Sequence, residues 1–123
     1  MATDSLISVV DDDLSVRESL PDLLRQLGFS ARAFSSAADF LESDAVARTR
    51  CLILDMAMPD MSGIDLQREL ALRRQEIPIV FITAHGDESS RASFQKEGAV
   101  EYLLKPFSDT ALLAAIHAVL RGR

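Results

Sequence analysis

The sequence predicts a doubly wound α/β domain, in which helices cover both faces of a five-stranded parallel sheet. Two observations predict this class. Short apolar runs rich in Val and Ile alternate with longer segments of helical periodicity, and 123 residues are the length of a single domain. Because a helix separates each strand from the next, right-handed crossovers place the strands parallel in one sheet. We therefore expect one domain over residues 1–123, with five strands and five helices.

Five segments are predicted as strands from their hydrophobic pattern. Nearly continuous apolar residues are typical of parallel strands buried on both faces, and they occur in Leu6–Val10, Cys51–Leu54 and Ile79–Thr83. A shorter apolar run, Tyr102–Leu104, is expected to form the last strand. Ser30–Phe34 alternates small and polar residues, which favours a weaker strand near an edge of the sheet.

The first helix is predicted from Val16 to Leu27, where leucines recur on one helical face. Gly28 follows directly and is a typical helix stop. Pro21 lies inside this segment. Because proline lacks the backbone N–H of an intrahelical hydrogen bond, we expect it to bend the helix.

The remaining helices are predicted from residues that can start them. Ser36 and Ser62 each precede an aspartate by three residues, the spacing of a capping box with Asp in place of Glu. The least apolar helix, at about Glu88–Glu97, follows Asp87, which can cap it. The last helix is expected to begin after Ser108.

Charge and composition exclude several classes of protein. Nineteen acidic residues against 13 basic ones give a net charge of −6 and a pI near 4.8, which disfavours direct nucleic-acid binding. No apolar run approaches the roughly 20 residues that cross a bilayer, and the first residues do not resemble a signal peptide. Cys51 is the single cysteine, so it forms no internal disulfide and is expected in the core. We therefore expect a cytoplasmic domain that binds neither membranes nor nucleic acid directly.

Chemically active side chains stand at the carboxyl ends of the predicted strands. Asp11–Asp13 follows the first strand, Asp55 the third and Lys105 the fifth, while Thr83 ends the fourth. In doubly wound sheets, ligands bind at this end of the strands. Each residue also has an ordinary structural explanation, and we interpret Asp13 as a turn or cap residue. Chance would rarely place the other groups on one edge, so together they indicate a site.

The residue types at this edge predict phosphoryl transfer. At close range the carboxylates of Asp11, Asp12 and Asp55 repel one another, so ionisation of all three is unfavourable without a cation. Oxygen ligands in low number favour Mg²⁺, for which Mn²⁺ is expected to substitute. With the metal, the Lys105 ammonium and the Thr83 hydroxyl can stabilise the charge that develops on a transferred phosphoryl group. Asp55 is then the predicted nucleophile, which forms an aspartyl phosphate.

The whole chain resembles the receiver domain of two-component response regulators, which has the CheY-like fold. Four segments carry the resemblance, in matching order and spacing: VVDDD at 9–13, LDMAMPDMSGIDL at 54–66, ITAHGD at 82–87 and EYLLKPF at 101–107. Two of them, TAHGD and KPF, are most similar to the FixJ group, whose output is usually a DNA-binding helix-turn-helix domain. The resemblance implies the strand order 2-1-3-4-5, and it places any output domain outside these residues.

The resemblance also implies how the metal and the phosphoryl group are held. Asp55 is the phospho-acceptor. Asp12 and Asp55 ligate Mg²⁺ directly, Asp11 does so through water, and the backbone carbonyl of Ala57 is the third protein ligand.

The same resemblance implies the phosphate contacts and the switch. Thr83 and Lys105 contact the phosphoryl group, together with Ala57 and Ala84. Thr83 and Tyr102 are the switch pair, in which the hydroxyl moves and the aromatic ring turns inward. The Lys105–Pro106 peptide bond is expected to be cis.

We predict a phosphorylation-driven switch, not an enzyme that acts on a pool of substrate, with at most weak autophosphatase activity. A sensor histidine kinase supplies the phosphoryl group, and the face of the fourth helix, last strand and last helix passes the signal to a homodimer or a transcriptional output. One alternative is a pseudo-receiver, a binding module that is not phosphorylated. An aspartate-nucleophile phosphatase is a weaker alternative, because its general acid would stand two residues after Asp55, at Ala57.

Overall fold

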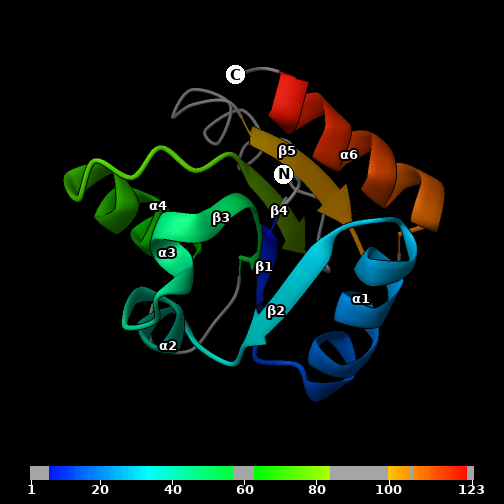
Figure 1. The fold of residues 1–123 in the computed structure, drawn as a ribbon, viewed down its shortest axis with the longest axis horizontal. Helices are drawn as coiled ribbons and strands as arrows, with labels where there is room; N and C mark the ends of the chain where they lie inside the picture. Colours follow the sequence, from blue (N-terminus) through cyan, green and yellow to red (C-terminus); the bar gives the residue numbers. More distant parts are fainter. Residues whose placement is uncertain (1–5, 57–62, 84–99, 106, 122–123) are drawn as a thin grey trace.

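The fold is a five-stranded, all-parallel sheet between two layers of helices (Figure 1). The computed structural model describes residues 6–56, 63–83, 100–105 and 107–121. The strands lie in the order β2-β1-β3-β4-β5, which confirms the predicted fold class. Their bounds are β1 Leu6–Val10, β2 Ser30–Phe34, β3 Thr49–Asp55, β4 Ile79–Thr83 and β5 Val100–Leu104.

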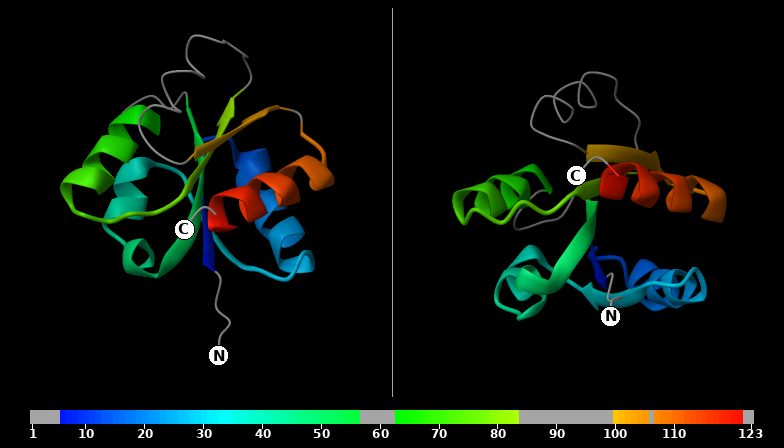
Figure 2. Two further views of the ribbon diagram at one scale, coloured as in Figure 1. Left: turned by 90° about the horizontal axis from the view of Figure 1, so that it is seen from above. Right: turned by 45° about the horizontal axis from the view of Figure 1, so that its top comes forward.

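Helices cover both faces of the sheet, as Figure 2 shows. One face carries α1 (Leu14–Gln26) and α6 (Asp109–Arg121), and the other carries α2 (Ala37–Leu41), α3 (Ala45–Arg48) and α4 (Gly63–Leu72). Alternate residues of the central strands therefore enter two separate cores. In β3, Leu52 and Leu54 belong to the core beneath α2, α3 and α4, while Cys51 and Ile53 belong to the core beneath α1 and α6.

The observed elements differ from the predicted ones in several places, and α1 begins at Leu14, two residues before its predicted start. β3 begins at Thr49 and β5 at Val100, each two residues before the predicted start. The helix expected after Ser36 is two short helices, because the Ser43 hydroxyl bonds both the Phe40 carbonyl and the Ala45 amide between them. The prediction for Glu88–Glu97 and the cap at Ser62 lie outside the described residues.

Helix α1 runs without interruption through Pro21, which is buried. Its end is a Schellman motif, in which the Gly28 amide donates to the Arg25 carbonyl and the Phe29 amide donates to the Leu24 carbonyl. Gly28 has φ +100°, so the predicted stop is confirmed. Helix α4 ends in the same pattern of hydrogen bonds, with Arg74 in place of the glycine at φ +59°.

Arg74→Gly is expected to raise the free energy of unfolding by about 0.5 kcal/mol. The left-handed conformation costs a residue with a Cβ about 1–2 kcal/mol, and part of that gain is lost to the larger entropy of unfolded glycine. Gly28→Ala is the reverse change and is expected to cost about 1 kcal/mol, although an added Cβ there meets no atom within 4 Å. Urea denaturation of both variants measures the two effects, and a destabilised Arg74→Gly would contradict the argument.

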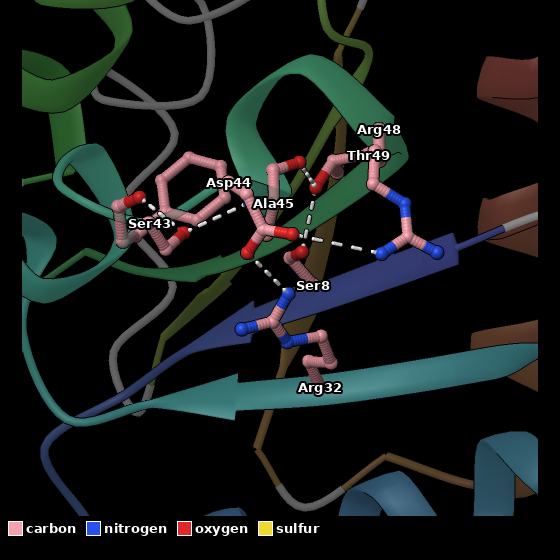
Figure 3. A network of polar contacts seen from close by, with 8 residues as sticks. Ser8, Arg32, Ser43, Asp44, Ala45, Arg48 and Thr49 are labelled. Carbon is pink, nitrogen blue, oxygen red and sulfur yellow. Dashed lines mark hydrogen bonds and ion pairs between the residues drawn. The ribbon is translucent and has the colours of Figure 1, made fainter.

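A chain of buried hydroxyls connects β1 to the start of β3 (Figure 3). The Thr49 hydroxyl donates to the Ala45 carbonyl at 2.7 Å. Because its single proton is used there, the Ser8 hydroxyl must be the donor to Thr49 Oγ1, 2.6 Å away. Ser8 is fully buried and Thr49 is 7% exposed. These hydrogen bonds offset the cost of removing two hydroxyls from water inside the sheet.

Thr49→Val is expected to destabilise the fold by about 2 kcal/mol, because it leaves the buried Ser8 hydroxyl without its acceptor. Ser8→Ala is expected to cost about 1 kcal/mol, since Thr49 keeps its bond to Ala45. The free energy of unfolding of the double variant should therefore fall by less than the sum of the two single decreases. Chemical denaturation of the three variants completes the cycle, and additive losses would show that the two hydroxyls do not interact.

Candidate functional site

Four strands end at one edge of the sheet and bring polar residues together there. β1 leads directly into Asp11, β3 ends in Asp55, β4 ends in Thr83 and β5 leads into Lys105. The register of the strands places Asp55 opposite Ile82, one residue before Thr83. These side chains come from neighbouring strands, as the parallel order requires.

The carboxylates of Asp11, Asp12 and Asp55 form an acidic cluster. Each offers an oxygen, and these atoms lie within 4.8 Å of one another. Asp11 is fully buried and Asp55 is 6% exposed, whereas Asp12 is exposed. Like charges at this spacing repel each other, and a cation placed among them relieves the repulsion. Three hard oxygen donors, one of them open to solvent, fit a hydrated Mg²⁺ ion.

Each polar atom of Asp11 takes part in a hydrogen bond. Its amide donates to the Phe34 carbonyl at 3.2 Å, and Oδ1 accepts from the Asp13 amide at 2.9 Å. Oδ2 accepts from Lys105 Nζ at 3.1 Å. Its carbonyl accepts from Arg17 Nη1, also at 3.1 Å. Asp11 is therefore held in one orientation by two strands, one helix and the turn that follows it.

Lys105 is the residue that forms an ion pair with the acidic cluster among the residues that the structure describes. The Lys105 side chain is 25% exposed and forms an ion pair with the buried Asp11 carboxylate. Burial alone would lower the pKa of Lys105, but the hydrogen bond and charge of Asp11, with smaller contributions from Asp55 and Asp13, raise the pKa. The Lys105 amide donates to the Thr83 carbonyl at 2.7 Å, which ties the end of β5 to the end of β4.

Asp13 stands outside the acidic cluster. It is the N-cap of α1, and its Oδ1 accepts a hydrogen bond from the Ser15 amide at 2.9 Å. The interpretation of Asp13 as a cap residue is therefore confirmed. Two consecutive aspartates thus have different tasks, because Asp12 faces the cluster and Asp13 starts the helix.

Thr83 and Tyr102 lie on neighbouring strands near this edge. Thr83 is 8% exposed and is paired with Leu104 in the β4–β5 register. Tyr102 is paired with Phe81, two residues further from the edge, and is half-buried against the core beneath α2, α3 and α4. Ala57, Ala84 and Pro106 lie outside the described residues, so the predictions made for them stay predictions.

Arg17 is a residue that the sequence analysis did not single out. Its guanidinium reaches back from the first turns of α1 to the Asp11 carbonyl. A basic residue shortly after an acidic turn is a weak signal in a sequence. Here the contact depends on how α1 packs against β1, which periodicity alone does not specify.

Comparison with known proteins identifies the class. Residues 7–117 match the family of the response regulator receiver domain, so the chain belongs to that family. It is a receiver domain of a two-component response regulator, and the resemblance seen in the sequence is confirmed. Among the described residues, no helix has the length and apolar character needed to cross a membrane.

The curated relatives include response regulators and transcriptional regulatory proteins. The response regulator protein TmoT of Ectopseudomonas mendocina is 44% identical over 96% of this chain and 54% of its own. Nodulation protein W of Bradyrhizobium diazoefficiens is 45% identical over 95% of this chain and 52% of its own. The chain thus spans about half the length of these relatives. The crystal structure of FixJ-N has a TM-score of 0.85 at 36% identity, with 99% of this chain and 98% of that chain covered.

Proposed function

We propose that Asp55 accepts a phosphoryl group in a Mg²⁺-dependent step and thereby switches the domain between two states. The observation that supports this proposal is the acidic cluster of Asp11, Asp12 and Asp55 with Lys105 beside it. A nucleophilic carboxylate, a site for a divalent cation and a fixed ammonium are the groups that phosphoryl transfer uses. Membership of the receiver family supports the same conclusion.

The proposed step is an in-line displacement at phosphorus. A carboxylate oxygen of Asp55 forms a bond to phosphorus as the bond between phosphorus and the imidazole nitrogen of a phosphohistidine breaks. The electron pair of that bond stays on the imidazole, which takes up a proton from solvent. Asp12, Asp55 and the Ala57 carbonyl would hold Mg²⁺ directly, and Asp11 would hold it through water. When bound, the metal neutralises charge on the phosphoryl oxygens.

Lys105 stabilises the product of this step. Its ammonium already lies 3.1 Å from Asp11 Oδ2, so it is placed at the cluster before any phosphoryl group arrives. Phosphorylation adds negative charge at Asp55 and offers Lys105 a second acceptor. Backbone amides of Ala57 and Ala84 and the Thr83 hydroxyl complete the phosphate contacts. The new hydrogen bond to Thr83 draws its side chain toward Asp55, and Tyr102 turns inward.

Membership of the receiver family also supports a proposal for the partners of this domain. A sensor histidine kinase supplies the phosphoryl group. The predicted helix at 88–97, with β5 and α6, forms the face that reports the state of Asp55 by homodimerisation. Because several relatives are transcriptional regulatory proteins of about twice this length, we infer a DNA-binding output domain outside these residues. The receiver acts on itself, in the cytoplasm, and not on a pool of substrate.

Intact-mass analysis with acetyl phosphate tests the proposal. The protein is incubated with the donor and Mg²⁺, with Mn²⁺, and with chelator. A gain of one phosphoryl group that requires the metal is the expected result, and peptide mapping after borohydride reduction should locate it at Asp55. A gain that persists in chelator would contradict the role of the acidic cluster. A phosphoryl group located on another residue would contradict the assignment of Asp55.

A further inference from the structure

Arg17 connects α1 to the acidic cluster through the backbone. The side chain is half-buried, and Nη1 donates to the Asp11 carbonyl at 3.1 Å. That carbonyl belongs to the peptide unit that joins Asp11 to Asp12. A charge-assisted hydrogen bond to it therefore restrains the rotation of the peptide that precedes Asp12.

Asp12 depends on such a restraint more than its two partners in the cluster. Asp55 ends a buried strand, and Asp11 is buried with each of its polar atoms hydrogen-bonded. Asp12 is exposed and lies in the turn between β1 and α1. Its position is set by its neighbours in the chain, since Asp11 is fixed to the sheet and Asp13 to the helix.

We propose that Arg17 is a positioning residue that holds Asp12 toward the cation by fixing the Asp11 carbonyl. The inference rests on the proposed function, because it concerns the same metal site. Arg17 touches neither the carboxylates nor a transferred group in this role. Its effect is to lower the entropy that the turn loses when the acidic cluster binds a cation.

The positive charge of Arg17 lowers the affinity for a cation, whereas the restraint on the Asp11 carbonyl raises it. A guanidinium near the cluster repels a divalent cation, so its removal alone would strengthen binding. Salt separates the two effects, because the Debye length falls to about 3 Å at about 1 M ionic strength. High salt weakens the charge effect, and the part that persists at this half-buried side chain opposes the expected loss of affinity and so cannot imitate it.

Arg25 is the matched control. It lies on the same helix and donates from Nη2 to a backbone carbonyl of the sheet, that of Ala31, at 2.9 Å. Arg25→Met removes the same charge and the same kind of bond as Arg17→Met, together with an exposed ion pair to Asp22. It does so at the far end of α1, away from the acidic cluster. A general loosening of α1 would affect both variants alike.

The experiment measures the dissociation constant of Mg²⁺ by NMR or calorimetry, in about 1 M KCl and without a phosphodonor. It compares the wild type with Arg17→Met, Arg17→Lys and Arg25→Met. Arg17→Met is expected to raise the dissociation constant about tenfold, the low end for residues that orient metal ligands. Arg17→Lys, which keeps a donor, should recover part of this loss, and Arg25→Met should bind like the wild type. Thermal unfolding in chelator verifies that each variant is folded.

Two results would overturn the inference: a dissociation constant for Arg17→Met within twofold of the wild type, or an equal loss in Arg25→Met. A second readout uses acetyl phosphate. The Mg²⁺ concentration for half-maximal phosphorylation should rise in Arg17→Met, while the maximal rate at saturating Mg²⁺ stays unchanged. Failure of the proposed function can be told apart from failure of this inference. If the proposed function is wrong, the wild type itself takes up no phosphoryl group.

Discussion

Asp55→Asn is expected to abolish phosphorylation by small donors and by a kinase, and to leave the fold intact. An amide oxygen is a far weaker nucleophile than a carboxylate, so the bond to phosphorus does not form. The substitution keeps the size of the side chain at the end of β3, where Asp55 is 6% exposed. It also removes one of three carboxylates that lie within 4.8 Å of one another. In chelator the free energy of unfolding should therefore rise by up to about 1 kcal/mol.

Two measurements check this result. Intact mass after incubation with acetyl phosphate and Mg²⁺ reports phosphorylation, and urea denaturation in chelator reports stability. Asp13→Asn is a suitable control, because Asp13 is a neighbouring aspartate that caps α1 and stands outside the cluster. The control should be phosphorylated like the wild type. Phosphate uptake by Asp55→Asn at the same rate would mean that another residue is the acceptor.

Lys105→Met is expected to lower the free energy of unfolding by about 2 kcal/mol in chelator. Asp11 is fully buried, and its carboxylate would lose the ammonium that now lies 3.1 Å away. Loss of the ammonium is costly because the buried Asp11 carboxylate keeps its charge while only its Oδ1 keeps a hydrogen bond, from the Asp13 amide. Bound Mg²⁺ replaces that compensation, so the metal should stabilise the variant more than it stabilises the wild type.

Thermal unfolding across a Mg²⁺ titration, at a pH where the carboxylates are ionised, measures this difference. Lys105→Arg keeps the charge and should behave like the wild type in chelator. If Lys105→Met lost the same stability with and without Mg²⁺, the ammonium and the metal would not share the same carboxylates. That outcome would also weaken the proposed placement of the cation at the cluster of Asp11, Asp12 and Asp55.

Much of the fold could be predicted from local pattern. The bounds of β1, β2 and β4 agree with the prediction because their residues are either continuously apolar or regularly alternating. The start of β3 could not be predicted in this way. The exposed Arg50 interrupts the apolar run before it reaches Thr49, whose buried hydroxyl bonds that of Ser8, 41 positions away.

The acidic cluster was predictable because it needs only strand ends and a parallel order. The carboxylates follow buried strands, and the sheet brings the ends of those strands together. The partners of Asp11 were not predictable from pattern. Lys105 pairs with Asp11 across 94 positions in the chain, and Arg17 bonds its carbonyl instead of solvent. Such contacts depend on side-chain reach within the folded structure.

The two cores have a consequence for how such a domain can diverge. Leu52 and Leu54 serve one core and Cys51 and Ile53 the other, so the sheet separates two layers that share backbone but no side chains. Substitutions beneath α4 can therefore accumulate without forcing changes beneath α6. One layer can specialise for a new partner while the other keeps its packing. The acidic cluster lies at the ends of strands that both layers share, so it can be kept through either course.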